Sequence, residues 1–199
     1  MDRHMSLTLG GIRQLGFVVR DIETAMVHWS RVLGVGPWFH LERSPGGADF
    51  RYYGKPSPSP HLFIALANSG DLQVELIQQL DESPSLYLDS LRRSGECAQH
   101  FAYWTDRFDD LAQQLFQAGY VEGHAGQRGS QGRFAYFVHS DLPSAMIELS
   151  ELSGGKGDRF AMIAPDAEQE PDSGKSRFRS STDCFWCFRQ VYDRYREKT

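Results

Sequence analysis

An internal repeat limits the fold of this chain more than any other feature of its sequence. Residues 14–34 and residues 100–119 match when one segment is shifted by 86 positions, so that Gln14 corresponds to His100. Each copy begins with a β-rich stretch and then changes to a helical pattern. Two unrelated segments rarely share both features in the same order. The chain therefore predicts a duplicated folding unit.

Each copy of the repeat predicts one amphipathic helix. Apolar residues recur at i, i+3, i+4 and i+7, beginning at Ile22 in the first copy. The same spacing begins at Phe108 in the second copy, and it places the apolar residues on one face of a helix. Glycine follows each predicted helix, at Gly34 and Gly119, where a left-handed C-cap is favoured.

Short β-rich segments, separated by turn-forming residues, follow each predicted helix. They are residues 38–42, 49–53, 61–67 and 72–78 in the first half, and 120–124, 134–139 and 145–149 in the second. The unit strand–helix–strand–strand–strand thus occurs twice, with one additional β-rich segment in the first half. This pattern predicts an α+β fold with two tandem βαβββ modules, in which a curved mixed sheet is backed by a helix in each half.

The remaining segments complete the expected organisation. Ser83 as N-cap and Pro84 at the first helical position predict a helix that connects the modules. Aromatic residues at helical spacing from Phe185 predict a C-terminal amphipathic helix. The expected boundaries are an N-terminal tail (1–9), a first βαβββ module (10–80), a connecting helix (81–97), a second module (98–152), a linker (153–180) and a C-terminal helical extension (181–199).

Composition excludes several classes of protein. A formal net charge of −5 argues against a nucleic-acid-binding protein, which usually has a basic surplus. Apolar runs stay well below the ~18 residues that a membrane span requires, so we expect no membrane association. Three cysteines, an odd and sparse set, suit a reducing compartment better than a disulfide scaffold. We therefore expect a cytoplasmic protein.

Four polar residues interrupt the apolar pattern of the predicted strands. Apolar residues that face a helix should alternate with residues on the opposite face of the sheet. Gln14 and His100 occupy that opposite face in the first strand of each module. Glu75 and Glu148 occupy it in the last strand, within the matching triplets V-E-L and I-E-L. Because equivalent positions carry such residues in both copies, we interpret the four as one candidate metal site.

These four side chains form a hard, oxygen-rich donor set. One imidazole, two carboxylates and an amide oxygen suit Zn²⁺, Ni²⁺, Co²⁺, Mn²⁺ or Mg²⁺ better than a soft ion such as Cu(I). Such an ion polarises a carbonyl group, and a neighbouring carboxylate accepts a proton from the adjacent carbon. Either Glu75 or Glu148 can take this role, since the two come from opposite halves of the chain.

The chain resembles the vicinal oxygen chelate superfamily, which includes glyoxalase I, methylmalonyl-CoA epimerase, bleomycin-resistance proteins and extradiol dioxygenases. The resemblance covers residues 10–152, from I-R-Q-L-G-F-V-V-R-D-I to M-I-E-L-S-E-L, and includes L-G-V-G-P-W at 33–38. It implies that the paired modules form a cleft around one divalent metal ion. The family's ligand positions fall on Gln14, Glu75, His100 and Glu148.

The resemblance also implies a function. Epimerases of this family usually have histidine at the first ligand position, whereas this chain has Gln14, and the complete set looks like zinc-using glyoxalase I. We therefore expect a glyoxalase-type lyase or isomerase, similar to lactoylglutathione lyase, with Glu148 as the first choice of catalytic base and Glu75 as the second. The alternatives are an acyl-CoA epimerase and a non-catalytic protein that binds a small molecule or an antibiotic.

Substrate and assembly follow as further expectations. The substrate is expected to be a small molecule, either a glutathione adduct or an acyl-CoA, and the protein a homodimer. Aromatic and basic residues on the short strands are candidates for lining the cleft, although such aromatics more often belong to a core. These candidates are Trp38, Tyr53, Phe63, Trp104 and Arg51.

Overall fold

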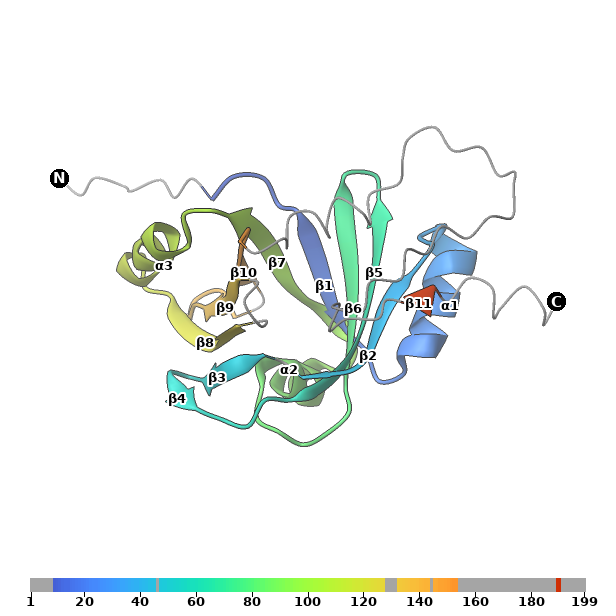
Figure 1. Ribbon diagram of the computed structural model, residues 1–199, viewed down its shortest axis with the longest axis horizontal. Helices are drawn as coiled ribbons and strands as arrows, with labels where there is room; N and C mark the ends of the chain where they lie inside the picture. Colours follow the sequence, from blue (N-terminus) through green and yellow to red (C-terminus); the bar gives the residue numbers. More distant parts are fainter. Residues whose placement is uncertain (1–8, 46, 128–131, 144, 154–188, 191–199) are drawn as a thin grey trace, which may run out of the picture.

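A computed structural model describes residues 9–45, 47–127, 132–143, 145–153 and 189–190. Within these ranges eleven strands form one strongly curved mixed sheet (Figure 1). The elements in chain order are β1 (Gln14–Val18), α1 (Ile22–Leu33), β2 (Phe39–Pro45), β3 (Ala48–Tyr52), β4 (Lys55–Pro56), β5 (His61–Ser69), β6 (Leu72–Gln79), α2 (Leu86–Ser94), β7 (Cys97–Thr105), α3 (Phe108–Gln117), β8 (Val121–Gln127), β9 (Arg133–Val138), β10 (Met146–Glu151) and β11 (Arg189–Gln190).

The order of the strands confirms the duplication. The sheet runs β11-β2-β5-β6-β1-β7-β10-β9-β8-β3-β4, so that β2-β5-β6-β1 in one half corresponds to β8-β9-β10-β7 in the other. In each half the first strand is parallel to the last, β1 to β6 and β7 to β10. The two first strands, β1 and β7, meet antiparallel at the middle of the sheet. The middle of the sheet therefore collects the first and last strands of both modules.

The helices α1 and α3 cover the convex face, one in each half (Figure 1). Ile22 and Met26 of α1 pack against β5 and β6. The helix begins after Asp21, whose side chain accepts a hydrogen bond from the Thr24 N–H at 2.9 Å, and it ends at Gly34 with φ of 67°. Both caps have the chemistry that such ends favour.

The end of α3 differs slightly from the sequence prediction. Its C-cap is Ala118, and the left-handed residue that we expected as the cap, Gly119, follows one position later with φ of 89°. The apolar stripe itself is as expected, since Phe108, Leu111 and Leu115 are buried against the sheet.

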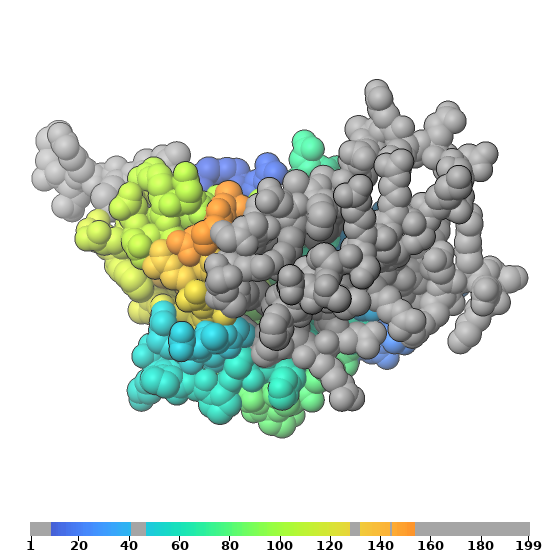
Figure 2. Space-filling view, viewed as in Figure 1, coloured from blue at the N-terminus to red at the C-terminus, as the bar shows by residue number. Residues whose placement is uncertain are grey.

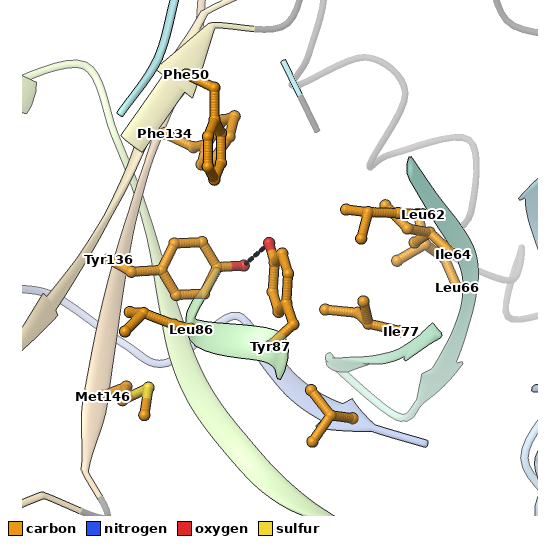
Figure 3. Packing of buried hydrophobic residues seen from close by; sticks show 11 residues of the cluster. Phe50, Leu62, Ile64, Leu66, Ile77, Leu86, Tyr87, Phe134, Tyr136 and Met146 are labelled. Carbon is orange, nitrogen blue, oxygen red and sulfur yellow. Dashed lines mark hydrogen bonds between the residues drawn. The ribbon is translucent and has the colours of Figure 1, made fainter. Parts of the chain in front are cut away.

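A second correction concerns the connecting helix. The predicted N-cap, Ser83, is not the cap, because its N–H donates to Asp81 Oδ1 in a turn before the helix. Ser85 caps α2 instead, and its hydroxyl accepts from the Leu88 N–H at 3.1 Å. The helix lies against the concave face of the sheet, where it contacts β1, β6 and β7. Figure 3 shows Leu86 and Tyr87 of this helix among the buried side chains of that face.

The hairpin β3–β4 departs from the predicted modules. Residues 49–53 were assigned to the first module, but β3 pairs antiparallel with β8, the edge strand of the second half. Figure 2 shows the cyan residues of this hairpin packed under the yellow strands of the second half. An unpaired edge strand exposes a row of backbone polar groups, and β3 supplies their partners on β8. The chain thus links its two halves at the far edge as well as in the middle.

The predicted C-terminal helix (181–199) and the linker before it lie mostly outside the described residues. At Arg189–Gln190 the structure has a short strand, β11, which pairs with Phe39 and His40 of β2. At these two residues the helix prediction is wrong, because the free edge of β2 offers backbone partners to an extended segment. Among the described residues, no helix is long and apolar enough to cross a bilayer.

Candidate metal centre

The four predicted ligand residues lie on four consecutive strands, β6, β1, β7 and β10. The pairing register arranges them in two adjacent rows. The first row holds Glu75, Gly16 and His100. The second holds Gln14 and Glu148, separated by one residue of β7. The topology therefore brings residues from distant parts of the sequence to neighbouring positions on one face.

Three of the four converge closely. One ligand atom each from Glu75, His100 and Glu148 lies within 4.8 Å of the other two. His100 Nε2 is 3.1 Å from Glu148 Oε2 and 3.4 Å from Glu75 Oε2. All three residues are buried. Two carboxylates that are desolvated together require a compensating positive charge, which a divalent cation or a protonated imidazole supplies.

Gly16 makes room for His100 between these strands. A Cβ atom built on Gly16 would lie 1.8 Å from His100 Cε1 and 2.4 Å from its Nε2. No side chain other than hydrogen fits there while the imidazole keeps its position. Gly16 was not among the predicted site residues, although a glycine inside a strand often marks a close approach of another group.

Hydrogen bonds orient both His100 and Glu148. Gln99 Oε1 is 2.6 Å from His100 Nδ1, and because an amide oxygen only accepts, Nδ1 carries the proton. Nε2, which faces the carboxylates, is then the nitrogen whose lone pair a metal ion would use. Ser150 Oγ donates to Glu148 Oε1 at 2.7 Å and leaves Oε2 toward the imidazole. Contacts of this kind tune and orient metal ligands.

Gln14 is held differently. Its Nε2 donates to Gln73 Oε1 at 2.7 Å, and both side chains are buried. The amide nitrogen is thereby engaged by Gln73, so the carbonyl oxygen of Gln14 is the atom that would face a cation. Gln73 and Gln99 were not among the predicted site residues. Polar residues are common on strands, and their role here becomes visible only from the register.

Electrostatics favour a proton in the centre when no cation is bound. Burial lowers the pKa of His100, but hydrogen bonds and charge from Glu148 and Glu75 outweigh it and raise the pKa to about 9. A proton and a metal ion would thus compete for the same nitrogen. One neutral imidazole and two carboxylates match the preferences of divalent ions such as Zn²⁺ or Mn²⁺, so the residues present fit the expected cofactor.

Two of the predicted cleft residues lie in the core beneath α1. Trp38 and Phe63 belong to the cluster formed by Ile22 and Met26 of that helix. Trp38 is buried, and its indole Nε1 donates to Ser30 Oγ at 3.0 Å. The structure does not bring either aromatic to the carboxylate pair, because alternate residues of a strand face opposite sides of the sheet.

The other three candidates are dispersed. Trp104 lies on β7, four residues after His100, and therefore on the same face of the strand. The guanidinium carbon of Arg13 is 5.1 Å from the centroid of the Trp104 ring. Arg51 of β3 makes a bidentate pair with Glu122 of β8, at 2.9 and 2.8 Å. Tyr53 is half-exposed and lines a pocket beside α2. Of the predicted substrate residues, only Trp104 shares the strand face of the candidate ligands.

Known proteins resemble the chain in sequence pattern and in fold. A family model described as Glyoxalase/Bleomycin resistance protein/Dioxygenase superfamily matches residues 13–137. No curated protein matches the sequence. Several solved structures, all less than 25% identical, share its fold.

Three of these structures illustrate the likeness. Methylmalonyl-CoA epimerase from Mycobacterium tuberculosis is 21% identical with a TM-score of 0.55, and the match covers 79% of this chain and 97% of the epimerase. A variant of the Streptomyces coelicolor epimerase, solved with 2-nitronate-propionyl-CoA, is 18% identical with a TM-score of 0.53, covering 72% and 96%. A hypothetical protein from Bacillus halodurans C-125 is 16% identical with a TM-score of 0.55, covering 72% and 95%.

Proposed function

The chain belongs to the Glyoxalase/Bleomycin resistance protein/Dioxygenase superfamily, and from this premise we propose that it is a metal-dependent enzyme that moves a proton on the carbon next to a carbonyl group. The convergence of Glu75, His100 and Glu148 within 4.8 Å carries this proposal. Gln14, on the neighbouring row, is proposed as the fourth ligand. One divalent ion held there would polarise a substrate carbonyl and make the adjacent C–H more acidic.

The two carboxylates have separate proposed roles. Glu148 is proposed as the catalytic base and Glu75 as its alternate. Ser150 holds one oxygen of Glu148 at 2.7 Å, so the other oxygen, which faces the imidazole of His100 at 3.1 Å, is the one proposed to accept the proton and return it. Both carboxylates are buried, so bulk water is largely excluded from the site of proton transfer.

The preferred substrate is a glutathione hemithioacetal, and the reaction that of a glyoxalase-type lyase. This choice rests on Gln14 at the first ligand position, where the resemblance points to glyoxalase I. The second candidate is an acyl-CoA epimerase. The epimerases with the same fold support it, as does an arginine-containing pocket described below. Both reactions remove and return a proton beside a carbonyl group.

Two measurements on the purified protein test the proposal. Elemental analysis should find about one divalent ion per chain, and removing it should abolish activity. Incubation in D₂O with the methylglyoxal–glutathione adduct or with methylmalonyl-CoA should show metal-dependent incorporation of deuterium at the carbon next to the carbonyl. A metal-free protein that binds antibiotics without turnover would instead identify a sequestering protein. The homodimer and the cytoplasmic location stay predictions.

A further inference from the structure

A pocket of about 700 Å³ lies beside α2, apart from the candidate metal centre. One face of α2 forms one wall, and the nearby ends of β8, β9 and β10 form the other. This volume falls within the range of pockets that hold small organic ligands, about 300–1,000 Å³. Its lining includes Tyr53, Leu86, Arg92, Arg93, His139 and Met146.

The floor of the pocket is apolar and continuous with the core of the concave face. Leu86 and Met146 line the pocket and also belong to that buried cluster, where Figure 3 shows both below Tyr136. Toward the rim, the half-exposed side chains of Tyr53 and Val121 leave apolar surface open to solvent. Apolar surface gathered in a hollow commonly marks a binding site.

The rim carries basic and hydrogen-bond-donating groups. Arg92 pairs with Glu82, but both side chains are largely exposed, so the pair is weak and easily exchanged. Arg93 is exposed and has no ion-pair partner among the described residues. The one acidic residue of the lining, Asp89, already accepts a hydrogen bond from Tyr52 at 2.6 Å. The guanidinium groups are therefore available to an anion.

His139 adds a hydrogen-bond donor to the pocket, the N–H at its Nε2. Its Nδ1 accepts a hydrogen bond from the Asp141 N–H at 3.1 Å, so the neutral ring carries its proton on Nε2. That Nε2 lies beside Gly119, where a built Cβ would come within 3.0 Å of it. A side chain at position 119 would crowd this nitrogen. The glycine thus leaves the imidazole N–H accessible in the pocket.

The pocket is connected to the candidate metal centre through two residues. Met146 pairs with His100 in the β10–β7 register. Its sulfur accepts a hydrogen bond from Gln99 Nε2 at 3.4 Å, and Gln99 Oε1 bonds His100 Nδ1 at 2.6 Å. Met146, which lines the pocket, is thus linked through Gln99 to the hydrogen bond that orients His100.

We propose that this pocket binds the phosphorylated nucleotide end of a coenzyme A thioester, with Arg92, Arg93 and His139 at the phosphates and Tyr53 against the base. This proposal rests on the acyl-CoA form of the proposed function. It identifies the nucleotide as the part of the substrate that the pocket recognises. Guanidinium groups bind phosphate strongly because their donors match its geometry. An exposed phenol ring offers a stacking surface for a purine.

Glutathione is the competing anionic carrier, since it has a carboxylate at each end of the tripeptide. Its carboxylates could meet the same arginines, but it has no aromatic ring for Tyr53 and Val121 to contact. The combination of apolar rim, aromatic side chain and two guanidinium groups favours a nucleotide. The test below separates the two carriers.

The experiment measures binding of two probes that lack a thiol, desulfo-coenzyme A and S-methylglutathione, to the full chain by calorimetry. Arg93→Gln is the test variant. Arg107→Gln is the matched control, because Arg107 is an exposed arginine whose guanidinium contacts only Asp110 on α3 among the described residues. Desulfo-coenzyme A should bind the unaltered protein, and Arg93→Gln should weaken it about tenfold, while the control leaves it unchanged. Arg92→Gln combined with Arg93→Gln should weaken it further.

Three results would overturn the proposal: no binding of desulfo-coenzyme A, equal binding to both variants, or Arg93-dependent binding of S-methylglutathione alone. Metal content and deuterium exchange, measured on the same samples, report separately on the proposed function. If the protein binds desulfo-coenzyme A through Arg93 but holds no metal, the pocket proposal stands and the proposed enzymatic function is wrong. If the protein holds metal and exchanges deuterium but does not bind desulfo-coenzyme A, the proposed function stands and the pocket proposal is wrong.

Discussion

The imidazole of His100 fills the space above Gly16, so close that a Cβ on Gly16 would lie 1.8 Å from His100 Cε1. The two residues pair across the junction of β1 and β7, where the duplicated halves meet. A register irregularity follows Gly16 at this point. The position of the central imidazole is thus set by a backbone that passes directly beneath it.

The first prediction concerns Gly16→Ala. The added methyl group must displace His100 or separate the strands, and overpacking of this kind costs about 1–3 kcal/mol. We expect the free energy of unfolding to fall by that amount and zinc affinity to fall at least about tenfold. Chemical denaturation and zinc titration measure the two effects. Gly11→Ala is the control, because nothing lies within 4 Å of a Cβ built on Gly11; equal behaviour of the two variants would show that Gly16 does not support His100.

The sequence could predict Glu75, His100 and Glu148 because the two glutamates occupy matching positions in the last strands of the two copies, and His100 matches Gln14 in the first strands. The convergence of the three on one another follows from the central pairing of β1 and β7. Gln73, Gln99 and Gly16 could not be predicted, since their importance depends on register and on distances between strands. Local patterns determine which face a residue occupies, and tertiary pairing determines its neighbours.

The second prediction compares the two carboxylates. Glu148→Gln keeps the size of the side chain but removes its charge, and if Glu148 is the base, turnover should fall at least ~10²-fold. Glu75→Gln should weaken metal binding with a smaller effect on turnover in the metal-saturated protein. Steady-state kinetics at saturating metal separates the two effects. Glu23→Gln, at an exposed position in the first turn of α1, should match the unaltered protein. Near-normal turnover in Glu148→Gln would remove the proposed role of this residue.

The third prediction follows from the pKa of His100, which its two carboxylate neighbours raise from 6.5 to about 9. A pKa that is higher in the folded than in the unfolded protein stabilises the fold below the unfolded value. In the presence of a chelator, stability from this group should be complete below about pH 6.5 and lost as pH rises toward about 9. Zinc affinity should change in the opposite direction and increase over the same range, because binding displaces the proton.

The measurement for this prediction is the free energy of unfolding of the chelated protein at a series of pH values. Glu148→Gln removes one of the charges that raise the pKa of His100, so the loss of stability should be smaller in this variant and should be complete at a lower pH. A profile that is the same with and without the Glu148 carboxylate would contradict the assigned cause.

The two modules could be predicted from the sequence, whereas the pairing of one hairpin and the start of one helix could not. Alternation and helical spacing identified both modules, since β1, α1, β7 and α3 each bury one clear face. The hairpin β3–β4 was assigned to the wrong half because nothing local records that its partner is β8, far along the chain. The start of α2 was misplaced by two residues for a similar reason, since Ser83 and Ser85 are both good caps and the Asp81 turn selects between them.

The fourth prediction tests whether Trp38 belongs to the core, as its position beneath α1 indicates, or to the substrate site. Trp38 is 4% exposed, and its indole N–H donates to Ser30 Oγ at 3.0 Å. Trp38→Phe leaves a cavity and removes the hydrogen bond, so it should lower the free energy of unfolding by roughly 1–3 kcal/mol. Zinc affinity and the KM of any substrate should stay within about twofold of the unaltered protein, because the side chain lies on the face away from His100. Trp104→Phe, on the strand face that carries His100, is the matched comparison and should change KM more than stability. A rise in KM for Trp38→Phe without loss of stability would contradict the core assignment and indicate that Trp38 contacts the substrate.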